Sequence, residues 1–259
     1  MTFAQGLFTP SPGAARPLRM LAVHARTEFL VTVRNAEQVL VVLLIPLALL
    51  VGLSSLELLP VPAGVARVDD VTPRVLALAV MSSAFTGQAI ALGFDRRYGA
   101  LKRLAATALP AWAIVAGRLV ALLGVVVLQL AVLCGVALLL GWRPAGTGVA
   151  WAVPVVLLGT AAFGALGVLL GGWLRAEIVL ALANALWFVL LVAGGMVVAA
   201  SELPGWLGEL VRFLPSGALA GGLDTVLRQG LAPGWTVVAV LAGWALAAGA
   251  LAARVLRLS

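Results

Sequence analysis

The sequence predicts an all-α membrane protein with six transmembrane helices, and three observations lead to this prediction. Of the 259 residues, 63% are hydrophobic and only 10% are charged, whereas a soluble domain is about half apolar and about a quarter charged. The mean hydropathy is +1.14. Six stretches are apolar over about 20 residues, the length that an α-helix needs to cross the ~30 Å hydrocarbon core of a bilayer.

The six expected spans follow one another along most of the chain. They are Gln38–Leu56, Val75–Phe94, Trp112–Leu140, Val149–Leu170, Ile178–Ala200 and Trp235–Ala253. The third is long enough to tilt or to project from the bilayer, and Arg118 near its start is expected to snorkel toward the cytoplasm. Three regions result: a flexible tail over 1–16, an interfacial helix over 17–37 and a membrane domain over 38–259.

The interfacial helix is predicted from helical periodicity before the first span. Arg19 and Arg26 are seven residues apart and share one face, while apolar residues recur on another. A helix of this kind lies in the membrane interface, here expected on the cytoplasmic side. The apolar positions are Leu18, Leu21, Ala22, Ala25, Phe29, Thr32/Val33 and Ala36.

Two short re-entrant helices are expected between the fifth and sixth spans, on the outer side. Residues 201–233 are too polar to span the bilayer and too apolar to stand free of it. Pro204 is suited to start one helix and Pro215 to end it, and Ala218–Gln229 is suited to form a second. We expect both helices to dip into the outer leaflet.

The basic residues predict the orientation of the chain. The N-terminal segment, the loop after the second span together with Arg118, Arg175 and the C-terminal tail hold 12 of the 17 basic residues. Cytoplasmic loops carry this excess in membrane proteins, so both termini and that loop are expected in the cytoplasm. The net charge of +7 is explained in the same way, and no nucleic-acid partner is expected.

Several activities lack the residues that they require. The only histidine is His24, expected outside the bilayer as an interfacial polar residue, and no Asp or Glu falls within the five later spans as drawn above. Proton-coupled transporters use such groups as relays. There is no G-x-x-x-x-G-K-[ST] motif for a nucleotide, and the single Cys134 allows neither a disulfide nor a cysteine metal site within the chain. We therefore expect no enzyme activity, no metal and no cofactor on this chain.

Polar and small residues within the spans are candidates for packing or for a substrate path. Each polar side chain is able to bond to backbone or to a neighbouring helix. Gly167-x-x-x-Gly171 permits two helices to approach closely. The polar residues are Ser82, Ser83, Thr86, Gln88, Gln129, Thr160 and Asn184.

Charge is concentrated in the segment that follows the second span, residues 94–107, here called the basic loop. Asp95 and Lys102 are seven residues apart, as are Arg96 and Arg103, which favours a short amphipathic helix that ends before Pro110. The helix is either a lipid-surface element or a lever for a soluble partner. Its apolar face is expected to hold Tyr98, Leu101, Leu104/Ala105 and Ala108.

The basic loop, FDRRYGALKRLAAT, resembles the E-[KR]-E-[KR]-G-T-[LF]-[EK]-x-L-x-x-T-P segment of type-2 ABC transporter permeases. These are the membrane subunits of bacterial drug, polysaccharide and lipid exporters. The similarity extends to Trp112 and Gly117-Arg118-Leu119, and to residues 203–207 and 212–215. Arg97, Ala100 and Leu109 depart from the family pattern.

This resemblance implies a permease dimer, of identical or related subunits, in the bacterial plasma membrane with membrane lipid around it. A cytoplasmic ABC ATPase dimer binds ATP and Mg, and this chain binds neither. The resemblance also implies that the interfacial helix with Arg19 and Arg26 contacts the ATPase. The expected ATPase contacts are Asp95, Arg96, Arg97, Tyr98, Leu101, Lys102 and Arg103.

In the family, the first and fifth spans line the dimer interface and the substrate route, which points to Asn184, Trp187 and Phe188. Because this route is so apolar, it suits an amphipathic drug- or lipid-like cargo. Two other functions remain open. One is a secondary transporter, disfavoured by the missing intramembrane acids, and the other is a membrane assembly or anchor subunit that transports nothing.

Overall fold

The computed structural model describes residues 15–57, 61–62, 64–107, 109–196 and 205–255, and the regular structure within them is entirely helical. The predicted tail, 1–16, lies almost wholly outside these residues. The helices are α1 Pro17–Arg34, α2 Ala36–Ser55, α3 Arg67–Met81, the π-helix η1 Ser82–Gly87, α4 Gln88–Arg97, α5 Ala100–Ala105, α6 Ala111–Leu139, α7 Val149–Trp173, α8 Ala176–Ala193, α9 Gly205–Phe213, α10 Pro215–Leu227 and α11 Trp235–Val255.

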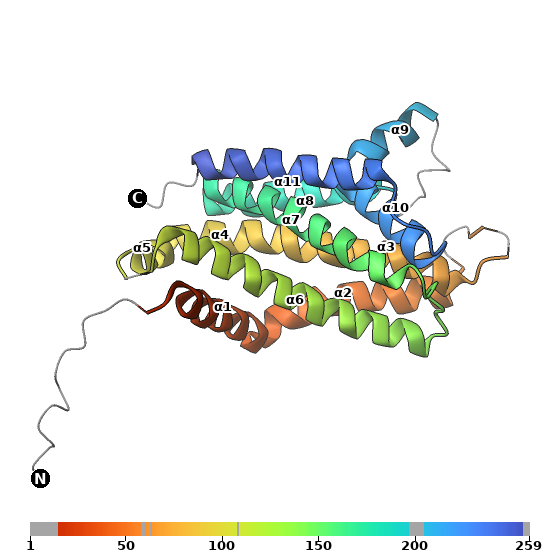
Figure 1. Cartoon of the computed structure of the whole chain (residues 1–259), viewed down its shortest axis with the longest axis horizontal. Helices are drawn as coiled ribbons and strands as arrows, with labels where there is room; N and C mark the ends of the chain where they lie inside the picture. Colours follow the sequence, from red (N-terminus) through yellow and green to blue (C-terminus); the bar gives the residue numbers. More distant parts are fainter. Residues whose placement is uncertain (1–14, 58–60, 63, 108, 197–204, 256–259) are drawn as a thin grey trace, which may run out of the picture.

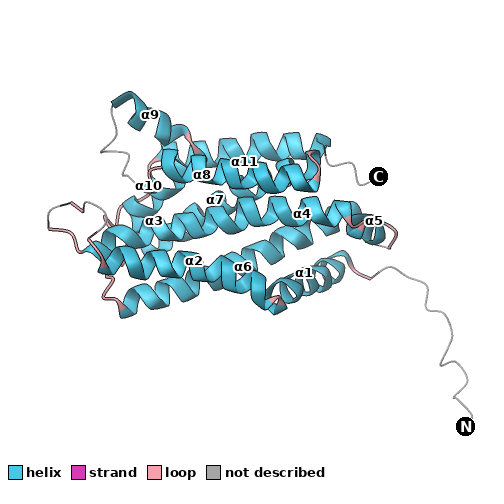
Figure 2. Ribbon diagram, turned by 180° about the vertical axis from the view of Figure 1, so that it is seen from behind, coloured by secondary structure: helices cyan, strands magenta, loops and turns pink. Residues whose placement is uncertain are grey.

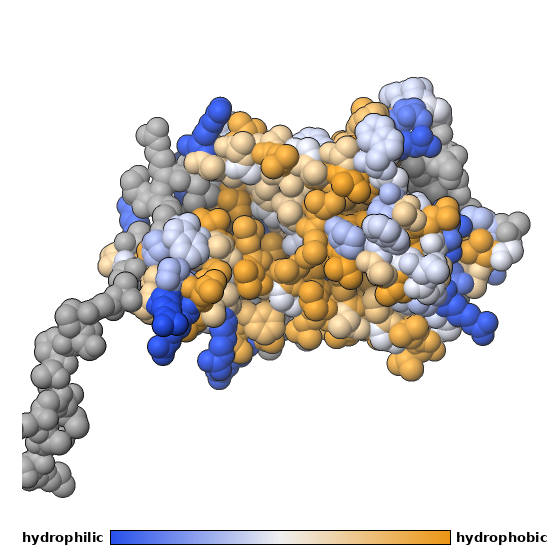
Figure 3. All heavy atoms as spheres, viewed as in Figure 1, coloured by the Kyte–Doolittle hydropathy of each residue, from blue (hydrophilic) through white to orange (hydrophobic). Residues whose placement is uncertain are grey.

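The long helices run side by side along one axis of the molecule (Figures 1 and 2). One end, here called the basic end, holds α5, the start of α1 and the last turn of α11, and the far end holds α9 and α10. Hydrophobic residues cover the middle of the surface and hydrophilic residues gather at the two ends (Figure 3). This distribution suits a bilayer around the middle.

Among the described residues, five helical stretches are long and apolar enough to cross a membrane, and the shorter stretch Val42–Ser55 within α2 is a sixth apolar helix. The prediction of an all-α, multi-pass membrane protein is therefore confirmed. Helices α2, α6, α7 and α11 begin and end within a few residues of the predicted spans.

The second span is longer than predicted. Helices α3, η1 and α4 form one continuous stretch, Arg67–Arg97, in place of Val75–Phe94. Its first turns contain Asp70, which is 2% exposed and forms an ion pair of 2.9 Å with Arg74. The expectation of no acid within the later spans is wrong here, because a basic partner four residues on compensates the buried carboxylate.

The fifth span is shorter than predicted. Helix α8 ends at Ala193, not at Ala200, because the chain turns at Gly194 and Gly195. Gly195 has φ +69°, a left-handed conformation that glycine adopts at low cost after a helix. Residues 197–200 lie outside the described part of the chain.

Helix α10 packs within the helical bundle, and its depth in the outer leaflet stays a prediction. It begins at Pro215 rather than Ala218 and packs among α3, α7 and α11. Leu219, Leu223 and Val226 are fully buried on it. Its last turn holds the Asp224–Arg228 ion pair, at 2.6 Å. An apolar helix of 13 residues, too short to span, thereby buries its backbone within protein.

Helix α7 approaches η1 closely at Gly167 and α4 closely at Gly171, the two glycines of the Gly167-x-x-x-Gly171 motif. A β-carbon on Gly167 would lie 2.7 Å from the carbonyl oxygen of Phe85, and one on Gly171 would lie 2.5 Å from that of Ala89. Backbone therefore lies directly against backbone at this crossing. The expected close packing is confirmed, and it holds the π-helix η1 against α7.

Replacing Gly171 by alanine is expected to lower the stability of the protein by about 1–3 kcal/mol, because the new methyl group overlaps a carbonyl that cannot move alone. The measurement is thermal unfolding of the purified protein in detergent. Gly135→Ala on α6 is the matched control, since nothing lies within 4 Å of a β-carbon there. Equal unfolding temperatures for the two variants would show that the α4–α7 crossing tolerates added volume.

Candidate functional site

The basic loop consists of two helices and a turn, not of one amphipathic helix. Helix α4 ends at Arg97, where the Tyr98 N–H donates to the Phe94 carbonyl (2.9 Å) and the Gly99 N–H donates to the Arg96 carbonyl (3.2 Å). Gly99 has φ +69°, which stops the helix. The seven-residue spacings therefore do not place Asp95 beside Lys102 or Arg96 beside Arg103 on one helical face. Residue 108 lies outside the described residues.

Asp95 is partly exposed and pairs with Arg118 of α6 at 2.5 Å. The same guanidinium donates from Nε to Oε1 of Gln88 (3.3 Å), and the Arg118 side chain is 14% exposed. Arg118 was expected to snorkel toward water, and the structure instead gives it a counter-ion on the preceding membrane helix. Two charges near the membrane end are thus satisfied within the chain.

The two arginines that end α4 join it to its neighbours α7 and α8. Arg96 donates to the carbonyl oxygens of Gly171 (3.0 Å) and Leu174 (3.3 Å) at the C-terminus of α7. A cation at this position is favourable, because the last carbonyls of a helix lack partners and carry negative potential. Arg97 forms an ion pair with Glu177 at the start of α8. Asp95, Arg96 and Arg97 together connect α4 to three other helices.

Five of the seven predicted contact residues are exposed, and three of them, Tyr98, Lys102 and Arg103, make no bond to α7 or α8 within the described residues. The Tyr98 ring is 65% exposed and stacks on Phe94, with 5.9 Å between ring centroids. Lys102 and Arg103 on α5 are exposed, and Arg103 makes a long hydrogen bond of 3.4 Å to the Tyr98 carbonyl. Leu101 is half-buried and lies toward α6.

Helix α1 packs along α6 with interlocking side chains. The His24 ring lies over Gly117, where a β-carbon would come within 2.4 Å of it, and the Phe29 ring lies over Gly124 at 3.0 Å. His24 was expected to be an interfacial polar residue, but its side chain is buried between the two helices because Gly117 leaves room for it. Arg19 remains exposed on the opposite face of α1, together with the second predicted residue, Arg26.

The predicted substrate-path residues on α8 also lie on two faces, one toward the bundle and one exposed. The Trp187 indole N–H donates to the Ser82 hydroxyl oxygen of η1 (2.9 Å), so this ring points into the bundle. Phe188 meets Trp187 edge to face at 5.0 Å and is itself exposed. Asn184 is exposed and donates to the Leu180 carbonyl of its own helix (2.8 Å).

Sequence reasoning missed Glu177, the partner of Arg97. The two residues are 80 positions apart, and no local pattern joins them. Most intramembrane polar side chains do find partners, as expected, although the Thr86 and Thr160 hydroxyls have none within the described chain.

Comparison with known proteins gives one family match. A family model described as ABC-2 type transporter matches residues 21–223, which includes most of α1, the basic loop and most of α10. No curated protein matches the chain.

The Asp95–Arg118 pair is expected to act as a unit. Asp95→Asn leaves a mostly buried guanidinium without its counter-ion, so it should lower the unfolding temperature more than the double change Asp95→Asn with Arg118→Gln does. We expect a coupling free energy of about 1 kcal/mol in the double-mutant cycle, measured by thermal unfolding in detergent. Additive effects of the two single changes would exclude a functional ion pair.

Proposed function

Because the chain belongs to the ABC-2 type transporter family, we propose that it is the permease subunit of an exporter driven by a separate cytoplasmic ATPase. The chain is a multi-pass membrane protein, and members of this family are the non-catalytic membrane component of transporters that work with an ABC ATPase. One observation carries the proposal. The basic end presents exposed Tyr98, Lys102 and Arg103 on a frame braced to three other helices.

The frame is suited to pass a displacement into the membrane. A partner that pushes on α5 moves α4, and α4 is joined to α6 through Asp95, to α7 through Arg96 and to α8 through Arg97. In this proposal Tyr98, Lys102 and Arg103 touch the ATPase, while Asp95, Arg96 and Arg97 position the lever. ATP and Mg are bound by the ATPase.

Helix α1 is proposed as a second support for the ATPase. Arg19 and Arg26 are exposed on its outer face, and its inner face is locked to α6 by His24 and Phe29. A force on α1 therefore reaches α6, the helix that Asp95 also contacts through Arg118.

We propose that a second permease subunit, identical or related, covers α8. This helix exposes the apolar Phe188 and the polar Asn184, while Trp187 is engaged with η1. The route beside α8 suits an amphipathic drug- or lipid-like cargo, because its exposed side chains are almost all apolar. The positive-inside rule supports an orientation with the basic end and both termini in the cytoplasm, and the family supports our proposal of a bacterial inner-membrane location.

Two rival functions make different demands on the chain. A secondary transporter needs a titratable group within the membrane whose charge changes during the cycle. In the second span, Asp70 is paired with Arg74 and Asp95 with Arg118, and Glu28, which makes no ion pair among the described residues, lies on α1, outside the spans. An anchor subunit needs the basic loop only as a topology signal and gives no role to the bonds that join α4 to α6, α7 and α8.

Reversal of the exposed charges on α5 is expected to disrupt ATPase docking. Lys102→Glu with Arg103→Glu should reduce the ATPase retained with the purified complex by at least about tenfold, because two attractive contacts become repulsive. The unfolding temperature of the permease should not change, since both side chains are exposed.

The matched control for this charge reversal is Arg212→Glu at the far end, where the arginine is exposed and pairs only with Glu209 among the described residues. Arg96→Glu is a second comparison, expected to lower both docking and stability because it removes the cap on α7. Normal ATPase retention in the Lys102/Arg103 double variant would rule out α5 as the docking element.

Transport itself is expected to require the ATPase. Vesicles that contain the purified chain alone should not accumulate an amphipathic cargo against its gradient, and vesicles that also contain the co-purified ATPase should do so with ATP and Mg. Accumulation driven by a proton gradient without ATP would favour a secondary transporter. No flux in either preparation would favour the anchor subunit.

A further inference from the structure

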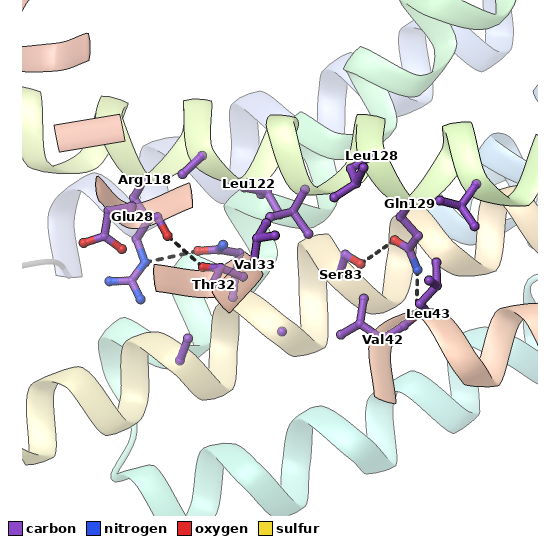
Figure 4. Close-up of a pocket in the computed structure, with 16 residues that line it drawn as sticks. Glu28, Thr32, Val33, Val42, Leu43, Ser83, Arg118, Leu122, Leu128 and Gln129 are labelled. Carbon is purple, nitrogen blue, oxygen red and sulfur yellow. Dashed lines mark hydrogen bonds between the residues drawn. The ribbon is translucent and has the colours of Figure 1, made fainter. Parts of the chain in front are cut away.

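A cavity of about 180 Å³ lies between α1, α2, η1–α4 and α6 (Figure 4). It is separate from the outward residues of the basic loop and from the exposed face of α8. Most of its wall is apolar, but six polar side chains line it. They are Glu28, Thr32, Ser83, Gln88, Arg118 and Gln129.

At one end of the cavity the polar groups satisfy one another. The Ser83 hydroxyl donates to Oε1 of Gln129 (2.7 Å), and Nε2 of Gln129 donates to the Val42 carbonyl (2.8 Å). Gln129 is 3% exposed. These bonds connect η1, α6 and α2. They also satisfy the Ser83 and Gln129 side chains, so this end of the cavity does not require a charged ligand. The π-helix η1, whose turn is wider than that of an α-helix, supplies Ser83.

At the other end one carboxylate has no partner. Arg118 is satisfied by Asp95 and Gln88, whereas Glu28 makes no ion pair within the described residues. No Lys or Arg stands three or four positions from Glu28 on α1, and the exposed Arg26 lies on the opposite face of that helix. The formal charges of Glu28, Asp95 and Arg118 therefore leave one net negative charge here.

The side of the cavity is apolar and reaches the membrane-facing surface. Val125, Leu128 and Val132 of α6 line it, and Leu128 is 42% exposed. A ligand with its head beside Glu28 has room to extend its apolar part along these residues toward the hydrocarbon of the bilayer. The cavity thus combines a half-buried negative end with an apolar exit.

We propose that this cavity binds an amphipathic molecule with a cationic amine head. The ammonium group lies against the Glu28 carboxylate, with the Thr32 hydroxyl beside it as an acceptor, and the apolar body lies along Val125 and Leu128. A charge-assisted contact with the half-buried Glu28 carboxylate adds to the apolar contact along α6. An anionic head is disfavoured, because Asp95 already neutralises Arg118 and Glu28 repels a second negative charge.

Binding at this site needs neither nucleotide nor ATPase. Only the further step, that the bound amine is the cargo or its entry site, rests on the proposed function. The shared chemistry of the ligand is the ammonium head, whether it belongs to an aminophospholipid or to a drug-like amine.

The test uses the full chain in nanodiscs of phosphatidylcholine and a photoreactive alkylammonium probe that carries a diazirine on its chain. Labelled peptides should map to α1, α2 and α6, and the matching alkyl sulfate probe should not label them. Glu28→Gln keeps the size of the side chain but removes the charge, and it should weaken binding of the ammonium probe by about tenfold or more. Glu209→Gln, an exposed acid at the far end, should bind as the unaltered chain does.

A second variant keeps Glu28 and fills the cavity. Val125→Trp should abolish labelling of the cavity by the ammonium probe, whatever the effect of Glu28→Gln on folding. Unchanged affinity in Glu28→Gln, or equal labelling by the sulfate probe, overturns the proposal.

Adding phosphatidylethanolamine to the nanodiscs distinguishes the two sources of the amine. If phosphatidylethanolamine competes with the probe, the ligand is a lipid headgroup. If labelling is unchanged, the ligand is a non-lipid amine. Both results require the ammonium site. Since the ATPase is absent, failure here leaves the docking result for Lys102 and Arg103 unaffected, so the two proposals fail separately.

Discussion

A charge beside hydrocarbon must find its partner within the protein, and this constraint organises both ends of the molecule. Near the basic end, Asp95 on α4 compensates Arg118 on α6. Near the far end, Asp70 compensates Arg74 within α3. The Asp95–Arg118 pair cross-links α4 and α6. The Asp70–Arg74 pair lies within α3 and allows the second span to begin before these charged residues.

The cross-links matter because they turn the basic end into a frame. Arg96 caps α7 and Arg97 pairs with Glu177 of α8, while the glycines of α7 bring its backbone against η1 and α4. Close packing transmits displacement better than a flexible loop, since packed interfaces resist continuous deformation. A lever for an outside motor needs this property, and the exposed Tyr98, Lys102 and Arg103 lie where such a lever would be pushed.

The cavity beside α1 differs from these sites because it holds a carboxylate without an ion pair among the described residues. Asp95 and Glu177 at the basic end are paired with arginines, and Glu28 makes no ion pair within the described side chains. An unpaired carboxylate at the mouth of an apolar cavity is able to form a charge-assisted hydrogen bond with the head of a cationic amphiphile. The buried face of α1 is thus both a mechanical contact with α6 and a wall of a binding site.

The sequence by itself determined the fold class, the approximate spans and the position of the basic loop, because bilayer thickness and local hydropathy act on each segment separately. Only the tertiary structure decided which charges remain available. Arg97 meets Glu177 from 80 positions away, and Gly99 breaks the helix that the seven-residue spacing predicts. His24 is buried because Gly117 of another helix leaves space for its ring. Each of these outcomes depends on the distance between helices that are remote in the sequence, which no local pattern encodes.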